Sequence, residues 1–167
     1  MTQTVTIRPA TPDDAAAIRQ IYAPYVDGTA ISFEEVVPSV ADMAARMSAN
    51  AASHGYFVAY QDDGQILGYA YGSQYRGRKA YQYTAEVSAY VAQSARGQGV
   101  GAALYDVLIP HLRDSGFHAL IAVVTLPNSA SEKLHERFGF DYIGTTPQVG
   151  RKFDSWHDIG IWQRTFE

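Results

Sequence analysis

The sequence predicts an α/β fold in which helices and strands alternate along the 167 residues. Two observations support this fold class. Short apolar strands bounded by glycine and other turn residues alternate with segments that begin at helix-capping residues. In addition, 47% of the residues are hydrophobic and 18% are charged, which is typical of a globular protein. We expect residues 1–167 to form a single domain, because this length suits one hydrophobic core.

Two helix starts in the first half of the chain carry capping signals, a Ser or Thr followed three residues later by Asp. Pro12 supports the first start, since proline is favoured in the first helical turn. The capping pairs are Thr11 with Asp14 and Ser39 with Asp42. The expected segments are helices over residues 13–25 and 39–51, strands over residues 5–8, 56–60 and 65–75, and a hairpin turn at Asp62-Asp63-Gly64.

The second half starts with a polar, basic loop and contains a glycine-rich turn between a strand and a helix. Gly116 is expected to end that helix, and Pro127 with Asn128 begins the last one. The apolar, β-branched run of residues 119–124 predicts a buried strand. In order, the expected segments are the loop 76–79, strand 83–91, helix 100–115, strand 119–124, helix 127–138, and strands 140–145 and 158–166.

Charge and composition argue against several classes of protein. The net charge of −4 disfavours nucleic acid as the main partner, because binding phosphates needs a basic face. The sequence has no cysteine, which fits a cytoplasmic location and excludes thiol chemistry. No apolar run reaches the roughly 18 residues of a membrane span, and the first residues lack the pattern of a signal peptide. None of the five histidines pairs at the spacing of a zinc helix, so no metal is expected.

The turn Arg96-Gly97-Gln98-Gly99-Val100-Gly101 is the strongest functional signal. Glycines let the backbone approach an anion, and the free N–H groups at a helix start point toward it. One interpretation is a dinucleotide fingerprint, but that motif usually opens its fold and here it follows several helices and strands. A turn without a ligand is a second interpretation. The third is the pyrophosphate loop of acyl-CoA N-acyltransferases, R/Q-x-x-G-x-G/A, which Arg96, Gly99 and Gly101 match.

With this motif and others, the chain resembles the GNAT N-acetyltransferases, and among them the phosphinothricin and methionine sulfoximine/sulfone acetyltransferases. The narrower signals are Leu134-His135-Glu136 and Trp156-His157-Asp158, and the likeness runs nearly end to end. It implies a three-layer fold whose mixed, mostly antiparallel central sheet is flanked by helices and splayed between strands 4 and 5. It also implies acetyl-CoA as co-substrate, a small amino acid as acceptor and a homodimer.

Acetyl transfer to an amine needs a base for the ammonium and an acid for the leaving thiolate. Glu86 is the candidate base, on the same strand face as Ser88 and Tyr90, although a carboxylate there could simply be solvated. His135 is the candidate acid, since it stands where most of the superfamily has a tyrosine. A packed helix histidine is the alternative for His135, and Tyr90 and Tyr105 are the alternative acids. The lack of cysteine favours direct transfer.

The resemblance implies that acetyl-CoA contacts the end of one strand, the glycine turn and the last helix, where Asn128 can also act as a cap. These residues are Ala89, Tyr90, Val91, Arg96, Gly97, Gln98, Gly99, Val100, Gly101, Asn128 and Ser131. A guanidinium in the basic loop matches a carboxylate or phosphinate, although the loop could equally be only solvated. The expected acceptor-binding residues are Phe33, Tyr75, Arg76, Arg78, Tyr81, Thr84 and Glu86.

Two other functions fit the same residues. One is acetylation of a protein or peptide N-terminus, which the basic and aromatic loop disfavours. The other is a non-catalytic acyl-CoA-binding regulator, which the carboxylate at Glu86 disfavours. The apolar end of the chain is expected either to join two copies or to complete the core of one, through Ile159, Ile161, Trp162 and Phe166.

Overall fold

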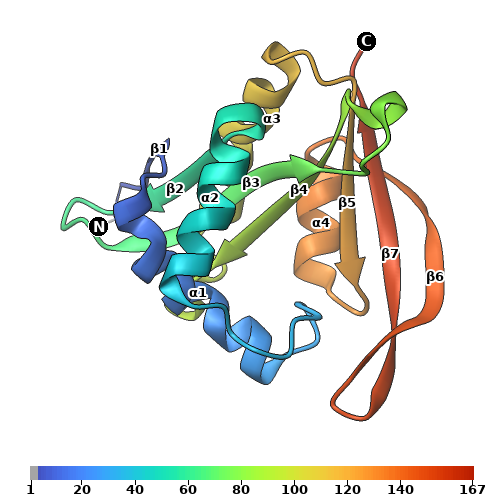
Figure 1. Ribbon diagram of the computed structural model, residues 1–167, viewed down its shortest axis with the longest axis horizontal. Helices are drawn as coiled ribbons and strands as arrows, with labels where there is room; N and C mark the ends of the chain where they lie inside the picture. Colours follow the sequence, from blue (N-terminus) through green and yellow to red (C-terminus); the bar gives the residue numbers. More distant parts are fainter. Residues whose placement is uncertain (1–3) are drawn as a thin grey trace.

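A computed structural model describes residues 4–167, which form one seven-stranded sheet with helices on both faces (Figure 1). The strand order is β1-β2-β3-β4-β5-β7-β6. Every neighbouring pair is antiparallel except β4 and β5, which are parallel. The strands are β1 (Thr6–Pro9), β2 (Tyr56–Tyr60), β3 (Ile66–Gln74), β4 (Thr84–Val91), β5 (Ala119–Thr125), β6 (Asp141–Lys152) and β7 (Ser155–Thr165).

The helices divide between the two faces of the sheet, so the expected three-layer arrangement is confirmed. Helices α1 (Ala15–Gly28) and α2 (Val40–His54) share one core, and α3 (Val100–Asp114) and α4 (Ser129–Arg137) pack into the other. The capping pair at the start of α2 forms as expected, since the N–H of Asp42 donates to Ser39 Oγ at 3.0 Å and the N–H of Ser39 donates to Asp42 Oδ2 at 3.2 Å. Short 3₁₀ turns cover Pro12–Asp14, Lys79–Tyr81 and Gln93–Ala95.

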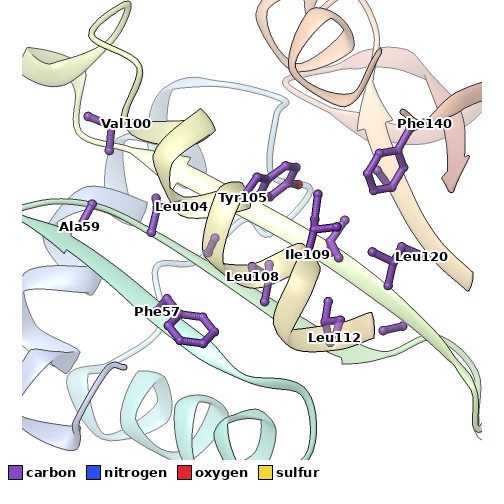
Figure 2. Packing of buried hydrophobic residues seen from close by; sticks show 14 of the residues in the cluster. Phe57, Ala59, Val100, Leu104, Tyr105, Leu108, Ile109, Leu112, Leu120 and Phe140 are labelled. Carbon is purple, nitrogen blue, oxygen red and sulfur yellow. The ribbon is translucent and has the colours of Figure 1, made fainter. Parts of the chain in front are cut away.

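The larger core lies between α3 and the sheet (Figure 2). Leu104, Leu108 and Leu112 recur every four residues along α3 and are fully buried, as expected for the inner face of an amphipathic helix. Burial of each such leucine contributes about 1.5–3 kcal/mol to folding. On β4, Ala85 and Val87 face this core. Because side chains alternate along a strand, Glu86, Ser88 and Tyr90 face the side of α1 and α2.

The largest difference from the expected elements is the final hairpin, in which β6 and β7 are both longer at the turn. The turn residues Phe153 and Asp154 both have positive φ, 52° and 56°, as in a two-residue type I′ turn. Such turns favour glycine, asparagine or aspartate, and Phe153 at the first position is none of these, so the sequence pattern did not predict the turn. Pro147 is tolerated inside β6 because β6 is the edge strand of the sheet.

The sheet opens between β4 and β5, as the resemblance implied. The two strands pair only from Thr84–Glu86 on β4 to Ala119–Ile121 on β5. Beyond Glu86, β4 continues beside β3 as far as Val91, whereas β5 continues beside β7. Residues 87–91 therefore present an unpaired strand edge inside the sheet, and backbone polar groups there need another partner.

Candidate active site

The gap between β4 and β5 opens into a cleft of about 520 Å³. Its walls come from the second half of β4, the glycine turn, the start of α3, the end of β5 and α4. All of the residues expected to bind acetyl-CoA line this cleft except Gln98, whose side-chain amide instead donates to the carbonyl oxygen of Ser94 at 2.9 Å. Residues from 89 to 131 that are far apart in sequence are thus gathered around one opening.

The glycine turn lies at one end of this cleft with open space in front of it. Gly97 and Gly99 have φ of 74° and 80°, a conformation that other residues adopt only with strain. A Cβ built on either glycine would meet no protein atom within 4 Å. The first hydrogen bond within α3 runs from the N–H of Ala103 to the carbonyl oxygen of Gly99, at 3.0 Å. The N–H groups of the residues just before Ala103 therefore have no partner within the helix and are free to bind an anion.

His135 and Tyr105 form a buried pair in the wall of the cleft. The Tyr105 hydroxyl lies 2.8 Å from Nε2 of His135, and Nδ1 lies 2.7 Å from the carbonyl oxygen of Ser131. A carbonyl accepts only, so Nδ1 carries the proton and Nε2 accepts from Tyr105. Burial lowers the pKa of His135, which keeps its ring neutral. Both ring nitrogens of His135 are occupied, and Tyr105 can act as the acid once its O–H turns from Nε2 toward the cleft.

Glu86 lies where β4 and β5 begin to separate, next to the cleft but not among the residues that line it. It is the last residue of β4 that pairs with β5, opposite Ile121, and Val87 beyond it lines the opening. Its cross-strand neighbour on β3 is Ser73. Burial raises the pKa of the Glu86 carboxyl, so it binds a proton more readily than an ordinary glutamate. These features suit a general base beside a reaction centre.

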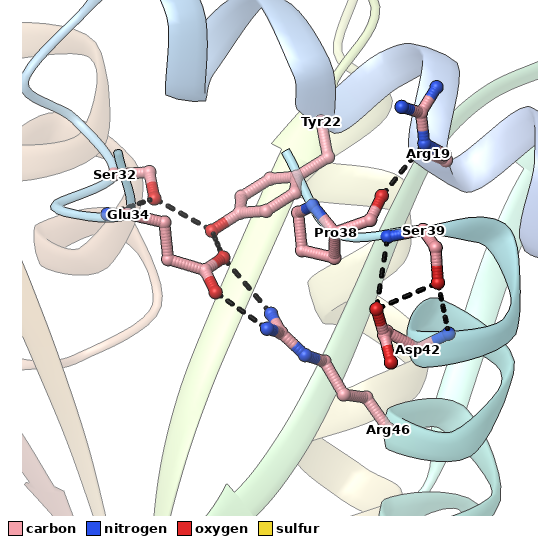
Figure 3. Close-up of polar contacts among 8 residues, drawn as sticks. All are labelled: Arg19, Tyr22, Ser32, Glu34, Pro38, Ser39, Asp42 and Arg46. Atoms are coloured by element: carbon pink, nitrogen blue, oxygen red, sulfur yellow. Dashed lines mark hydrogen bonds and ion pairs between the residues drawn. The ribbon is translucent and has the colours of Figure 1, made fainter. Parts of the chain in front are cut away.

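A polar network that the sequence analysis missed holds the loop between α1 and α2 (Figure 3). The Tyr22 hydroxyl lies 2.6 Å from Ser32 Oγ and donates to the carboxylate of Glu34. Arg46 of α2 donates to both oxygens of that carboxylate, at 2.6 and 3.0 Å, and holds the pKa of Glu34 below its usual range. The ring of Tyr22 also packs edge-on against Tyr90, with centroids 5.1 Å apart, so the network reaches the cleft.

The expected acceptor-binding residues fall into two groups. The Arg76 guanidinium lies over the rings of Tyr75 and Tyr81, at 5.0 and 5.5 Å, in the loop before β4. In the same loop Arg78 is exposed, and Thr84 is half-buried at the start of β4. Phe33 lies elsewhere, against β6 and β7, with its ring centroid 6.2 Å from that of His157. The structure therefore does not join Phe33 to the basic loop.

The comparison with known proteins assigns the family. The profile of the acetyltransferase (GNAT) domain matches residues 7–161. This chain belongs to the GNAT acetyltransferase family. The phosphinothricin N-acetyltransferase of Alcaligenes faecalis is 41% identical to this GNAT protein over 160 residues, which are 95% of the chain and 81% of the relative.

Two further relatives agree with this assignment. The L-methionine sulfoximine/L-methionine sulfone acetyltransferase of Pseudomonas paraeruginosa is 36% identical and covers 94% of this GNAT protein and 92% of its own length. The solved structure of a GNAT superfamily phosphinothricin acetyltransferase from Sinorhizobium meliloti, in complex with AcCoA, is 36% identical. It superimposes with a TM-score of 0.93 and covers 99% of this chain and 89% of its own.

Over residues 4–167, no group of three or more His, Asp or Glu is placed to hold a metal ion. In the same part of the chain, no helix combines the length and the apolar character needed to cross a membrane.

Proposed function

We propose that this protein transfers the acetyl group of acetyl-CoA to the amino group of a small amino acid analogue, such as phosphinothricin, methionine sulfoximine or methionine sulfone. The observation that carries the proposal is the cleft between β4 and β5, with the glycine turn in its wall and Glu86 next to Val87, which lines it. The names of the relatives, which cover nearly the whole chain, support the same substrate class.

The residues of the cleft fit acetyl-CoA. The open space before Gly97 and Gly99 leaves room for a diphosphate at the start of α3. Arg96, Lys133 and Arg137 supply positive charge around the same cleft in a protein of net negative charge. The free edge of β4 offers backbone groups to the amides of the pantetheine arm, as an extra strand would. A volume of about 520 Å³ lies within the usual range for ligand pockets.

Asn128 has a divided role in this proposal. Its Oδ1 accepts from the N–H of Ser131 at 3.3 Å, which caps α4 as expected. The amide nitrogen of the same side chain is left to donate toward the cleft that Asn128 lines. The cap thereby fixes the direction of a donor for the pantetheine arm.

The protein's own residues supply the proton transfers. Glu86 accepts a proton from the acceptor ammonium, which frees the lone pair of the amine for attack on the thioester carbon. Tyr105 turns its O–H from Nε2 of His135, which Ser131 fixes, to the departing sulfur and donates its proton there, and the tyrosinate that remains takes a proton from solvent. The C–S bond breaks as the C–N bond forms, so no residue carries the acetyl group. Arg78, which is exposed, binds the acidic group of the acceptor.

A thiol-release assay with acetyl-CoA and a panel of acceptors tests the proposal. We expect turnover with methionine sulfone, methionine sulfoximine or phosphinothricin and none with short peptides. Turnover confined to peptides would favour the N-terminal acetyltransferase. Binding of acetyl-CoA without turnover on any acceptor would favour the non-catalytic regulator.

We also propose a homodimer, but with an interface that differs from the one expected at the end of the chain. Trp162 and Phe166 are buried in the larger core, so they complete one copy and are not free to join two. Ile159 and Ile161 are half-buried. A group of exposed apolar side chains lies instead on β6, β7 and their turn, at Tyr142, Ile143, Val149, Phe153 and Trp156. Light scattering at micromolar concentration tests for the dimer. We also propose a cytoplasmic location, which cell fractionation tests.

A further inference from the structure

Lys152 at the end of β6 is a buried lysine with an unusual pair of contacts. Its side chain is only 3% exposed. Nζ donates to the carbonyl oxygen of Val26 at 2.6 Å and to that of Ser32 at 2.8 Å. Among residues 4–167, no carboxylate forms an ion pair with this ammonium. Burying a charge is costly, and these two hydrogen bonds offset the loss of water together with the Phe153 ring, 5.0 Å from Nζ, and the nearby carboxylates of Asp27, Glu34 and Glu35.

Each carbonyl that Lys152 binds lacks a regular partner. Val26 is in the last turn of α1, where the final carbonyl groups have no N–H within the helix. This end of a helix also carries partial negative charge, which favours a cation. Ser32 lies in the loop between α1 and α2, residues 29–39, outside any helix or strand. One ammonium therefore joins the end of α1 and this loop to β6, although 120 and 126 residues separate the partners.

The loop that Lys152 holds reaches the cleft. Ile31 lines the cleft directly. Phe33 packs so closely on Gly150 of β6 that a Cβ there would collide with its ring. His157 of β7 lies beside Phe33 and has its Nε2 3.0 Å from the carbonyl oxygen of Lys152. The loop, the end of β6 and the start of β7 thus form one packed unit at the end of α1.

We infer that Lys152 is a positioning residue for the acceptor: it fixes the loop of residues 29–39 as one wall of the site and so sets affinity for the amino acid. The inference rests on the proposed acetyltransferase function. Lys152 donates to neither the glycine turn nor α3. Its link to the acetyl-CoA cleft is indirect, through Ile31 and through Tyr25 beside Val26, so we expect a smaller effect on acetyl-CoA than on the acceptor. The Tyr22–Glu34–Arg46 network holds the same loop from α2, and Lys152 adds the tie to the hairpin of β6 and β7.

The test compares Lys152→Met, which keeps the length of the side chain but loses its donors, with Lys152→Arg, which keeps the donors. Removing hydrogen bonds from a charged donor should raise the KM for methionine sulfone about 10-fold or more. The Kd for acetyl-CoA, measured by calorimetry, should change less than about twofold, since the glycine turn is untouched. Lys152→Arg should restore part of the acceptor affinity.

Arg151→Met is the matched control, because Arg151 neighbours Lys152 on β6 but is exposed and contacts Asp154 and Trp156 of the hairpin. It should change neither constant. Hydrogen exchange supplies a readout independent of activity: residues 29–39 should exchange faster in Lys152→Met and unchanged in Arg151→Met. If Lys152→Met does not fold, Lys152→Gln, which keeps one donor group, takes its place.

Three results would overturn the inference. They are equal losses for acceptor and acetyl-CoA, unchanged KM for the acceptor, and unchanged exchange of residues 29–39. A failure of the proposed function looks different, because the unmodified protein would then acetylate no amino acid while the exchange comparison could still be made.

Discussion

The hydroxyl of Tyr105 lies 2.8 Å from Nε2 of His135, and the carbonyl oxygen of Ser131 lies 2.7 Å from Nδ1 of the same ring. These two contacts assign one proton to each partner: His135 donates to Ser131, and Tyr105 donates to His135. His135 consequently has no free N–H to turn toward a thiolate, and Tyr105, a residue of the cleft wall, donates to one only after its O–H turns away from His135. The sequence predicted His135 as the acid with Tyr105 as an alternative, and these contacts favour the alternative.

Tyr105→Phe should therefore lower kcat about 10²-fold, the usual size of a general-acid contribution, with little change in the Kd for acetyl-CoA. The variant also leaves Nε2 of His135 without its donor, which should cost about 1–3 kcal/mol in the free energy of unfolding. Steady-state kinetics and thermal unfolding measure the two effects. An unchanged kcat would remove Tyr105 from the proton path.

Gly99→Ala should weaken acetyl-CoA binding at least about 10-fold, because a Cβ there meets no protein atom and would instead meet the diphosphate. Gly64→Ala is the matched control, since Gly64 has φ of 84°, against 80° for Gly99, and its Cβ also meets nothing within 4 Å. Both variants should lose about 1–2 kcal/mol of stability through backbone strain. Calorimetry measures the affinity for acetyl-CoA of the two folded variants. Equal affinities in Gly99→Ala and Gly64→Ala would show that the turn does not hold the diphosphate.

Glu86→Gln should stabilise the protein at neutral pH. The folded state raises the pKa of this carboxyl, so folded protein binds the proton more tightly than unfolded protein does. The cost of ionising Glu86 is absent below the unfolded pKa and is fully present above the folded pKa. Thermal unfolding should show a higher Tm for Glu86→Gln at pH 7 and no difference at pH 3. A lower Tm at pH 7 would mean that Glu86 makes favourable contacts instead.

Arg78→Ala should raise the KM for the amino acid about 10- to 150-fold, because a charge-assisted hydrogen bond contributes about 1.5–3 kcal/mol. Arg78→Lys should restore only part of the affinity for the amino acid, because the point charge of an ammonium lacks the two-pronged geometry of a guanidinium. The KM for acetyl-CoA is the internal control. Equal changes in both constants would assign Arg78 to the order of the loop, and no change would reopen the peptide-substrate interpretation.

Local signals in the sequence predicted the parts of the fold that rest on local interactions. The Ser39–Asp42 pair marked α2 correctly because a capping box is a contact over three residues. The glycine turn was equally visible, since positive φ at Gly97 and Gly99 favours glycine. By contrast, the turn at Phe153 and Asp154 has positive φ at both residues and contains no glycine, so no local sequence pattern predicted it.

The contacts that complete the candidate site join residues far apart in sequence, and composition or periodicity carries no trace of them. Glu34 finds Arg46 twelve residues away only because α1 and α2 pack together on the sheet. In the sequence, Lys152 has no feature that distinguishes it from an exposed lysine. Only the folded chain brings its ammonium to the carbonyl oxygen of Val26 in α1. Nor does the sequence show that Ser131 and Tyr105 occupy both nitrogens of His135.

The central claim is that the cleft between β4 and β5 acetylates the amine of a small amino acid with Glu86 as base. Mass spectrometry of the acceptor, after incubation with acetyl-CoA and either the unmodified protein or Glu86→Gln, tests it most directly. With methionine sulfone, the unmodified protein should give the N-acetyl product, and Glu86→Gln should form it about 10²-fold more slowly, with the acidic limb of the pH–rate profile gone. Equal rates of product formation by the two proteins, or no acetylated amino acid with either, would contradict it.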